Sequence, residues 1–125
     1  MIMGIGTDLV SLARIEILLL RFGQKFTKRI LTDPELAHFQ SSSNPVSYLA
    51  KRFAAKEAVA KAFGTGIGAH LSFNEISVTN LPSGQPTVAF IGKSKEYVQM
   101  SPMKSLHISL SDEKAFALAF VVITQ

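Results

Sequence analysis

The helix-forming segment 46–63 carries the first residues that could do chemistry. On a helical wheel, Glu57 and Lys61 border one side of an apolar stripe. Arg52 and Lys56 border its other side. Charged groups in such places either form structural ion pairs or line a site, and Glu57 with Lys61 at positions i and i+4 is an ordinary helical pair. Both explanations remain open from the spacing alone.

Asp8 is a second candidate, because it ends an apolar stretch directly after two glycines, Gly4 and Gly6. Its carboxylate either points out of the end of a sheet, where it could serve a site, or caps the helix that follows. The glycines allow another group to approach the backbone closely. They match neither a Walker loop nor a dinucleotide-binding fingerprint, so they are a weak indication of phosphate binding.

A polar face alternates with an apolar one in the segment around His107. Ser109 and Ser111 share the polar face with His107, since successive side chains of a strand point to opposite sides. This face is either solvent-exposed or a cradle for an anion. The other two histidines, His38 and His70, lie in less patterned segments and are expected at the surface.

Three basic residues, Arg14, Arg21 and Lys25, would form a narrow stripe on one continuous helix, provided that Gly23 does not interrupt it. No acidic residue stands four positions from any of them to neutralise the stripe. A solvated face and a docking surface both explain the pattern. The missing acidic neighbours favour the docking of an acidic partner.

The composition limits the class of protein. The chain has 125 residues, 47% hydrophobic and 18% charged, which predicts one globular domain and excludes disorder. No apolar run reaches the roughly 20 residues of a membrane-spanning helix and no secretory signal is evident, so we expect a soluble, cytoplasmic protein. The absence of cysteine leaves oxygen or imidazole ligands for any metal. A net charge of +4 favours nucleic acid, a phosphorylated small molecule or an acidic protein as partner.

The candidate residues have to be positioned by a mixed set of helices and strands. Apolar periodicity predicts strands over residues 1–10, 76–79, 87–91, 106–110 and 115–123. It predicts helices over residues 12–31, 34–40, 46–63 and 94–100, the first weakened at Gly23. Ser11, Asp33 and Asn44 are expected to cap the first three helices. Helices first and hairpins later predict a single α+β domain over residues 1–125, with a mostly antiparallel sheet packed against the long central helix.

Two longer motifs carry a resemblance. The first is GIGTDLV at Gly4–Val10, and the second is RFAAKEA at Arg52–Ala58, followed by KAFGTGIG at Lys61–Gly68. With the closing segment His107–Asp112, they resemble the holo-[acyl-carrier-protein] synthase family, the short bacterial 4'-phosphopantetheinyl transferases. The resemblance implies the fold of that family. It also implies transfer of 4'-phosphopantetheine from coenzyme A to a serine of apo acyl carrier protein, with release of adenosine 3',5'-bisphosphate, in support of fatty acid biosynthesis.

The resemblance further assigns roles to the matched residues. It implies that Asp8 and Glu57 bind Mg²⁺ and that Lys61 reaches the pyrophosphate of coenzyme A. The implied catalytic residues are therefore Asp8, Glu57 and Lys61. The base that accepts the serine proton is either Glu57 or a metal-bound water. Besides Lys61, the implied cofactor-binding residues are Arg52, Gly64, Thr65, Gly66 and His107.

The expected partners follow from the same resemblance. Arg14, Arg21 and Lys25 would dock the acidic carrier protein, and neither nucleic acid nor membrane is expected as a partner. The enzyme would be a homotrimer in which His107 serves the site whose metal is bound by Glu57 of the adjacent chain. The closing strand, apolar on both faces, and the alanine-rich side of the long helix agree with surfaces that need cover.

Two positions differ from other members of that family. Val10 stands where longer relatives carry a second acidic residue, so a water would take that place. The loop 41–44 lacks the basic residue that some relatives carry. How the 3'-phosphate is held without such a residue is left open by the sequence.

Two functions of other classes are the alternatives. A small basic α+β domain could bind RNA, but its aromatic residues are mostly phenylalanines in apolar positions. Only Tyr48 and Tyr97 remain, so no exposed stacking platform is evident. A non-catalytic adaptor for acidic proteins would use the basic stripe and leave the carboxylates and lysine of the two motifs unexplained.

Overall fold

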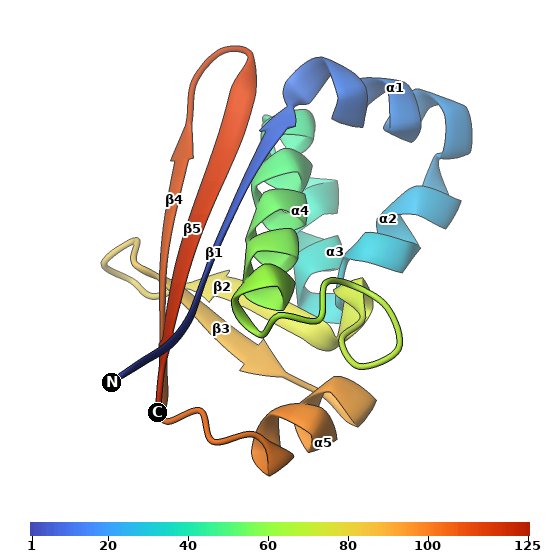
Figure 1. Ribbon diagram of the computed structural model, residues 1–125. Coiled ribbons are helices and arrows are strands. Elements are labelled where there is room, and N and C mark those ends of the chain that lie inside the picture. Colours follow the sequence, from blue (N-terminus) through green and yellow to red (C-terminus); the bar gives the residue numbers. More distant parts are fainter.

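The computed structural model describes residues 1–125 and shows helices packed on two antiparallel sheets (Figure 1). The strands are β1 (Ile2–Ser11), β2 (Ile76–Asn80), β3 (Pro86–Phe90), β4 (Ser105–Asp112) and β5 (Phe116–Thr124). The helices are α1 (Leu12–Phe22), α2 (Gln24–Ile30), α3 (Asp33–Ser41), α4 (Pro45–Ala62) and α5 (Gly92–Met100), with one 3₁₀ turn, η1 (Phe73–Glu75). The predicted α+β class and antiparallel pairing are confirmed. None of the helices is both long enough and apolar enough to cross a membrane.

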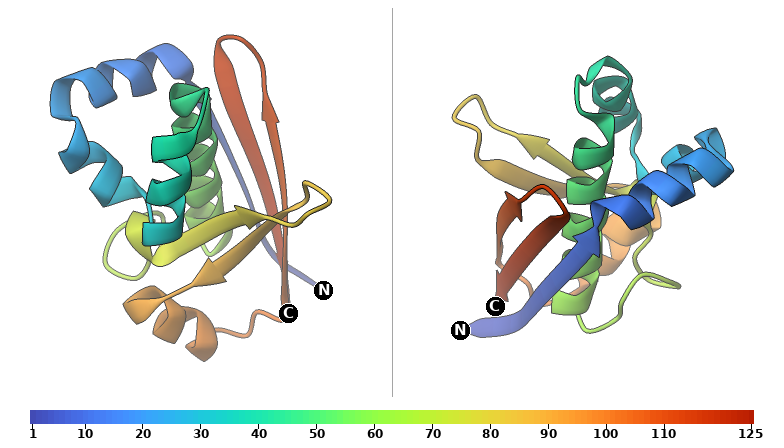
Figure 2. Two further views of the ribbon diagram at one scale, coloured as in Figure 1. Left: turned by 180° about the vertical axis from the view of Figure 1, so that it is seen from behind. Right: turned by 90° about the horizontal axis from the view of Figure 1, so that it is seen from above.

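The long helix α4 covers one face of the three-stranded sheet (Figure 2). The strand order is β1–β5–β4, and both pairings are antiparallel. The side chains of β5 that pack toward α4 alternate along the strand and are fully buried: Ala117, Ala119, Val121 and Ile123. The hairpin β2–β3 forms a separate sheet that also contacts α4. The helix is therefore the element to which both sheets are attached.

Gly4 and Gly6 bring β1 into direct contact with α4. A Cβ atom at Gly6 would lie 1.9 Å from the carbonyl oxygen of Ala58, and one at Gly4 would lie 2.0 Å from that of Ala62. The predicted close approach to the glycine backbone is confirmed, with α4 as the approaching group. The alanines on this side of α4 are buried by the chain's own strand. The expectation that another chain covers them is therefore wrong.

The first helix ends at Gly23, well before the predicted end. Gly23 has φ 54°, a left-handed value that glycine adopts without steric cost, and its N–H group closes the last turn of α1. Helix α2 starts at the next residue in a new direction (Figure 1). Lys25 consequently lies on a different helix from Arg14 and Arg21. The single continuous basic stripe is not formed.

The cap of the short helix α3 also differs from the prediction. Ser11 caps α1 as expected, with its Oγ accepting the N–H of Arg14 at 3.3 Å. For α3, however, the cap is Thr32 and not Asp33. The Oε1 atom of Glu35 accepts the Thr32 N–H at 2.8 Å, and this bond from the third helical residue defines a capping box that begins at Thr32.

Candidate active site

Asp8 and Lys61 meet where β1 lies against α4. Asp8 pairs with Ala119 of β5, whose side chain faces the helix, so Asp8 also points toward α4. The Nζ atom of Lys61 lies 3.1 Å from Asp8 Oδ1 and 3.1 Å from the carbonyl oxygen of Thr7. Lys61 thus forms its ion pair with the strand and not with Glu57. Lys61 and Glu57 therefore do not form the helical ion pair, and Asp8 does not cap the helix that follows, which is capped by Ser11.

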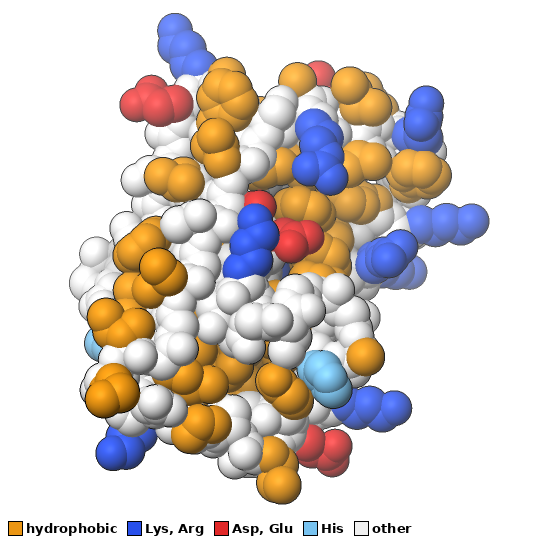
Figure 3. Space-filling view, viewed as in Figure 1, with side chains coloured by type: hydrophobic (Ala, Val, Ile, Leu, Met, Phe, Trp, Pro, Cys, Tyr) orange, Lys and Arg blue, Asp and Glu red, His pale blue; other side chains and the backbone are white.

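Glu57 is half-buried next to this pair. Burial raises the pKa of its carboxyl group, and the negative charge of Asp8 raises the pKa further. The positive charges of Lys61 and Arg14 act in the opposite direction. The guanidinium of Arg14, from α1, lies 5.6 Å from the ring centroid of Phe53. Figure 3 shows acidic and basic side chains meeting in the middle of this face, beside a hollow lined with hydrophobic side chains.

Asp8, Glu57 and Lys61 lie together, and we call these two carboxylates and their lysine the carboxylate cluster. Two neighbouring carboxylates favour a cation between them, and their oxygens are the ligands that Mg²⁺ prefers. No other acidic residue and no histidine joins Asp8 and Glu57 in a metal-ligating group, so phosphate oxygens and water would complete the coordination. The side chain of Lys61 is half exposed, so its ammonium group is available to a phosphate. The donor set therefore fits a hard divalent cation together with a pyrophosphate.

The predicted cofactor loop after α4 is built as a helix end. Gly64 and Gly66 have φ values of 80° and 66°, which terminate the helix. The N–H groups of Thr65 and Gly66 donate to the carbonyl oxygen of Ala60, and that of Gly64 donates to the carbonyl of Lys61. These donors are used within the chain. A cofactor would still find open space at the loop, because nothing lies within 4 Å of a Cβ position at either glycine.

Arg52 lies in a separate polar cavity of about 510 Å³, which none of the three cluster residues lines. Its Nη2 donates to Asn80 Oδ1 at 2.7 Å, and its guanidinium stacks on the ring of Tyr48 at 4.5 Å. Its Nε atom is buried without a hydrogen-bond partner. Sequence reasoning missed Tyr48 and Asn80 as site residues. Asn80 comes from β2, far from Arg52 in the chain, whereas Tyr48 stands one turn before Arg52 on α4, a spacing that could have indicated the contact. His38 is exposed, as expected, and stacks on Tyr48.

His107 lies on the opposite face of the sheet from the carboxylate cluster. It pairs with Val122 of β5, whereas Asp8 pairs with Ala119 on the face that α4 covers. Its ring nitrogen Nε2 lies 3.2 Å from the hydroxyl oxygen of Ser105, and the side chain is exposed. Because alternate residues of a strand point to opposite faces, one chain cannot bring His107 to Asp8.

Of the three basic residues predicted to bind a partner, only Lys25 lines a groove between α1 and α2. Arg14 and Arg21 lie on α1, and Lys25 lies on α2. Together with a second cation, Arg29, Lys25 borders an apolar cavity of about 370 Å³, which we call the α1–α2 groove. Its apolar lining consists of Leu18, Phe22, Phe26, Ile30, Phe53 and Phe73. A basic rim around an apolar floor suits an acidic amphipathic helix.

Comparison with known proteins identifies the class of protein to which this chain and its fold belong. The family description "4'-phosphopantetheinyl transferase superfamily" matches residues 4–121. A solved structure of holo-[acyl-carrier-protein] synthase from Neisseria meningitidis is similar with a TM-score of 0.96 and 46% identity, covering 100% of both chains. The chain thus has the fold of the 4'-phosphopantetheinyl transferase superfamily and belongs to that superfamily.

More detailed similarity narrows this class. A holo-[acyl-carrier-protein] synthase from Pectobacterium atrosepticum is 48% identical over 122 residues, 98% of this chain and 97% of that protein. The holo-(acyl-carrier-protein) synthase of Bacillus anthracis, solved in complex with CoA (3',5'-ADP), has a TM-score of 0.82 and 40% identity, covering 98% of this chain and 96% of that one. The chain belongs to the holo-[acyl-carrier-protein] synthase family. The RNA-binding alternative has no support among these relatives.

Proposed function

We propose that the protein transfers 4'-phosphopantetheine from coenzyme A to a serine hydroxyl of apo acyl carrier protein, in the cytoplasm and in support of fatty acid biosynthesis. The serine oxygen forms a bond to the β-phosphorus, the bond to the bridging oxygen breaks, and adenosine 3',5'-bisphosphate leaves. The carboxylate cluster carries the proposal, in a chain that belongs to this family. Transfer of a phosphoryl group depends mainly on positioning and charge neutralisation, which this cluster is suited to supply.

The carboxylates of Asp8 and Glu57 would hold Mg²⁺. When bound, the ion would neutralise the pyrophosphate and stabilise charge that develops on the leaving group. Lys61 would then exchange its contact with Asp8 for a phosphate oxygen, since its ammonium group is exposed enough to do so. After burial, the negative charge of Asp8 is the next cause of the raised pKa of Glu57, and this closeness of the two carboxylates supports the assignment.

Either Glu57 or a metal-bound water would accept the serine proton. Burial raises the pKa of the Glu57 carboxyl group, which favours a base, whereas a bound cation would lower that pKa. The α1–α2 groove opens on the same face of the molecule as Glu57, because Phe53, one helical turn earlier on α4, lines it. A carrier protein in that groove would present its serine close to Glu57.

We further propose that the enzyme is a homotrimer with active sites shared between chains. The uncovered face of the β1–β5–β4 sheet carries a band of large apolar side chains that are 42% to 63% exposed: Ile5, Leu9, Phe116, Leu118 and Phe120. A surface of this kind needs cover. His107 lies on that face, so a neighbouring copy seated there would bring a carboxylate cluster toward it. The number three comes from the family resemblance.

The cavity around Arg52 is the place proposed for the 3'-phosphate end of coenzyme A. The buried guanidinium supplies positive charge, and its unpartnered Nε offers a donor. Asn80 holds the guanidinium in place through the bond to Nη2. These features support binding of a phosphate there without a basic residue in the loop 41–44. Lys51, which also lines the cavity, adds a second cation.

One experiment tests the reaction directly. Apo acyl carrier protein is incubated with the protein, coenzyme A and Mg²⁺, and its mass is measured. A gain of one phosphopantetheine is expected, together with adenosine 3',5'-bisphosphate in equal amount. An unchanged carrier mass with folded protein would refute the proposed function. Light scattering of the same sample tests the trimer, for which three times 13.6 kDa is expected and a monomer mass would refute it.

A further inference from the structure

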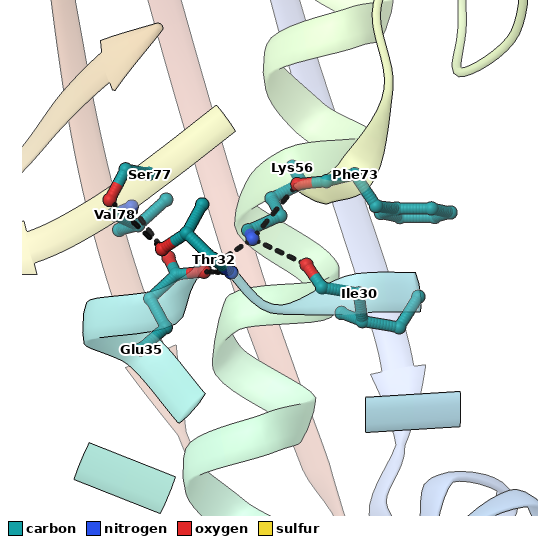
Figure 4. A network of polar contacts seen from close by, with 7 residues as sticks. All are labelled: Ile30, Thr32, Glu35, Lys56, Phe73, Ser77 and Val78. Atoms are coloured by element: carbon teal, nitrogen blue, oxygen red, sulfur yellow. Dashed lines mark hydrogen bonds and ion pairs between the residues drawn. The ribbon is translucent and has the colours of Figure 1, made fainter. Parts of the chain in front are cut away.

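A buried ion pair between Glu35 and Lys56 lies outside the carboxylate cluster (Figure 4). Both side chains are fully buried, and Lys56 Nζ lies 2.5 Å from Glu35 Oε1. The ammonium group also donates to the carbonyl oxygens of Ile30, at 2.5 Å, and Phe73, at 3.0 Å. An ammonium group has three donors, and each one is used here.

Glu35 extends the same network to two further segments. Its Oε1 atom accepts the N–H of Thr32, and its Oε2 atom accepts the N–H of Val78 in β2 at 2.6 Å. The pair therefore joins the end of α2, the start of α3, helix α4, the turn η1 and strand β2. Replacing a buried ion pair by apolar residues is often neutral or stabilising, so stability alone is a weak reason for such a network. What the network does specify is one arrangement of five elements.

The network connects the two halves of the proposed reaction. Lys56 directly precedes Glu57 on α4, and the two side chains point about 100° apart around the helix. On one side, Glu57 belongs to the carboxylate cluster. On the other, Lys56 binds the carbonyls of Ile30 and Phe73, and both of these residues line the α1–α2 groove. Lys56 thus links two residues that line the groove to the position next to Glu57 on α4.

We propose that Lys56 and Glu35 are positioning residues for the transfer reaction. They hold the α1–α2 groove at a fixed distance from Glu57, so that the serine of a docked carrier protein reaches the carboxylate cluster. This inference rests on the proposed function and on docking of the carrier in the groove. It assigns a purpose to a buried charged pair in which Lys56 lines neither the Arg52 cavity nor the α1–α2 groove, while Glu35 lines the Arg52 cavity.

The test compares initial rates of wild type, Lys56→Met and Glu35→Gln with apo carrier protein and coenzyme A varied separately. Methionine keeps an unbranched apolar side chain, one atom shorter than that of lysine, and removes all three donors. Glutamine keeps an acceptor for Lys56 and for the Thr32 N–H and loses only the acceptor for the Val78 N–H, so this milder variant decides the outcome if Lys56→Met does not fold. We expect Lys56→Met to lower kcat/KM for the carrier by about tenfold to a hundredfold, with a raised carrier KM. The KM for coenzyme A should stay within about twofold of wild type in Lys56→Met, since Lys56 does not line the Arg52 cavity. Glu35 does line that cavity, so only the carrier KM is compared for Glu35→Gln.

A merely structural role gives a different result. Loss of folded protein lowers kcat in proportion to the folded fraction and leaves both KM values unchanged. Ile123→Ala, a buried substitution on β5 far from α2, is the control for loss of stability and should show that pattern. Glu35→Gln should show a smaller rise in carrier KM than Lys56→Met. A wild-type carrier KM in both folded variants would overturn the inference, whereas a wild type that transfers nothing would refute the proposed function instead.

Discussion

Replacement of Gly6 by alanine tests whether the contact between β1 and α4 sets the geometry of the active site. The new Cβ atom would lie 1.9 Å from the carbonyl oxygen of Ala58 and 2.7 Å from the main-chain nitrogen of Ala62. Real Cβ contacts are essentially never under 3.0 Å, so strand and helix must separate by at least about 1.1 Å, which is 3.0 minus 1.9. The obstacle is backbone on both sides, and a rotamer change cannot relieve it.

That separation acts directly on the carboxylate cluster, because Asp8 lies two residues from Gly6 on β1 while Glu57 and Lys61 lie on α4. A flexible lysine can follow Asp8, but the two carboxylates move apart with their elements. We expect turnover to fall by about a hundredfold, the effect of a displacement of about 1 Å in an active site. Overpacking should also lower the free energy of unfolding by about 1–3 kcal/mol.

The assay combines urea unfolding with initial rates, and Gly68→Ala is the matched control. Gly68 has no left-handed φ, and nothing lies within 4 Å of its Cβ position, so alanine fits there. The control should keep wild-type turnover and change the free energy of unfolding by no more than about 1 kcal/mol. A Gly6→Ala variant with the stability and turnover of wild type would show that the glycine does not set this geometry.

Four shorter predictions concern the carboxylate cluster, the basic residues of α1, the turn η1 and the assembly of chains. Asp8→Ala and Glu57→Ala should each abolish nearly all transfer while the fold is kept, and excess EDTA should do the same to wild type; near-normal turnover would remove them from the metal site. Arg21→Glu should raise the carrier KM far more than that for coenzyme A and flatten its salt dependence, and equal effects on both would argue against docking. The hydroxyl of Ser94 and the main-chain N–H groups of Ser94 and Lys93 donate to Glu75 and lower the pKa of its carboxyl group. This contribution to stability is complete above the unfolded pKa of 4.5 and is lost as the pH falls through the lower folded pKa. Glu75→Gln should remove that part of the acid-induced loss, measured by thermal unfolding as the pH is lowered from above 4.5. Mixing Glu57→Ala with His107→Ala chains should restore roughly a quarter of wild-type activity in random trimers, and a mixture that stays inactive despite subunit exchange would contradict shared sites.

Much of the fold could be predicted from local patterns. Apolar periodicity located every strand and α-helix to within one or two residues at most ends, since alternation and helical spacing are properties of neighbouring residues. The break at Gly23 was the main error, because a glycine tolerated in a helix and one that ends it look alike in sequence. The motifs likewise singled out Asp8, Glu57 and Lys61 as candidates, and the structure brings these three residues together.

Other features depend on contacts between distant segments. The cavity partner Asn80 could not be predicted, nor could the pairing of Lys56 with Glu35, because each contact joins elements that periodicity treats separately. Tyr48 stands four residues before Arg52 on α4, so helical spacing could have indicated their contact. The spacing of Lys61 suggested a helical partner, yet the packing of β1 on α4 gives it Asp8.

The sequence by itself determined which elements form and which side chains carry charge, because both depend on residue type and short-range spacing. The tertiary structure alone decided which of those side chains meet. Strand register places Asp8 on the face that α4 covers and His107 on the opposite, exposed face. Register and helix packing are set by side-chain fit over the whole core, and a shift of one residue would exchange the two faces.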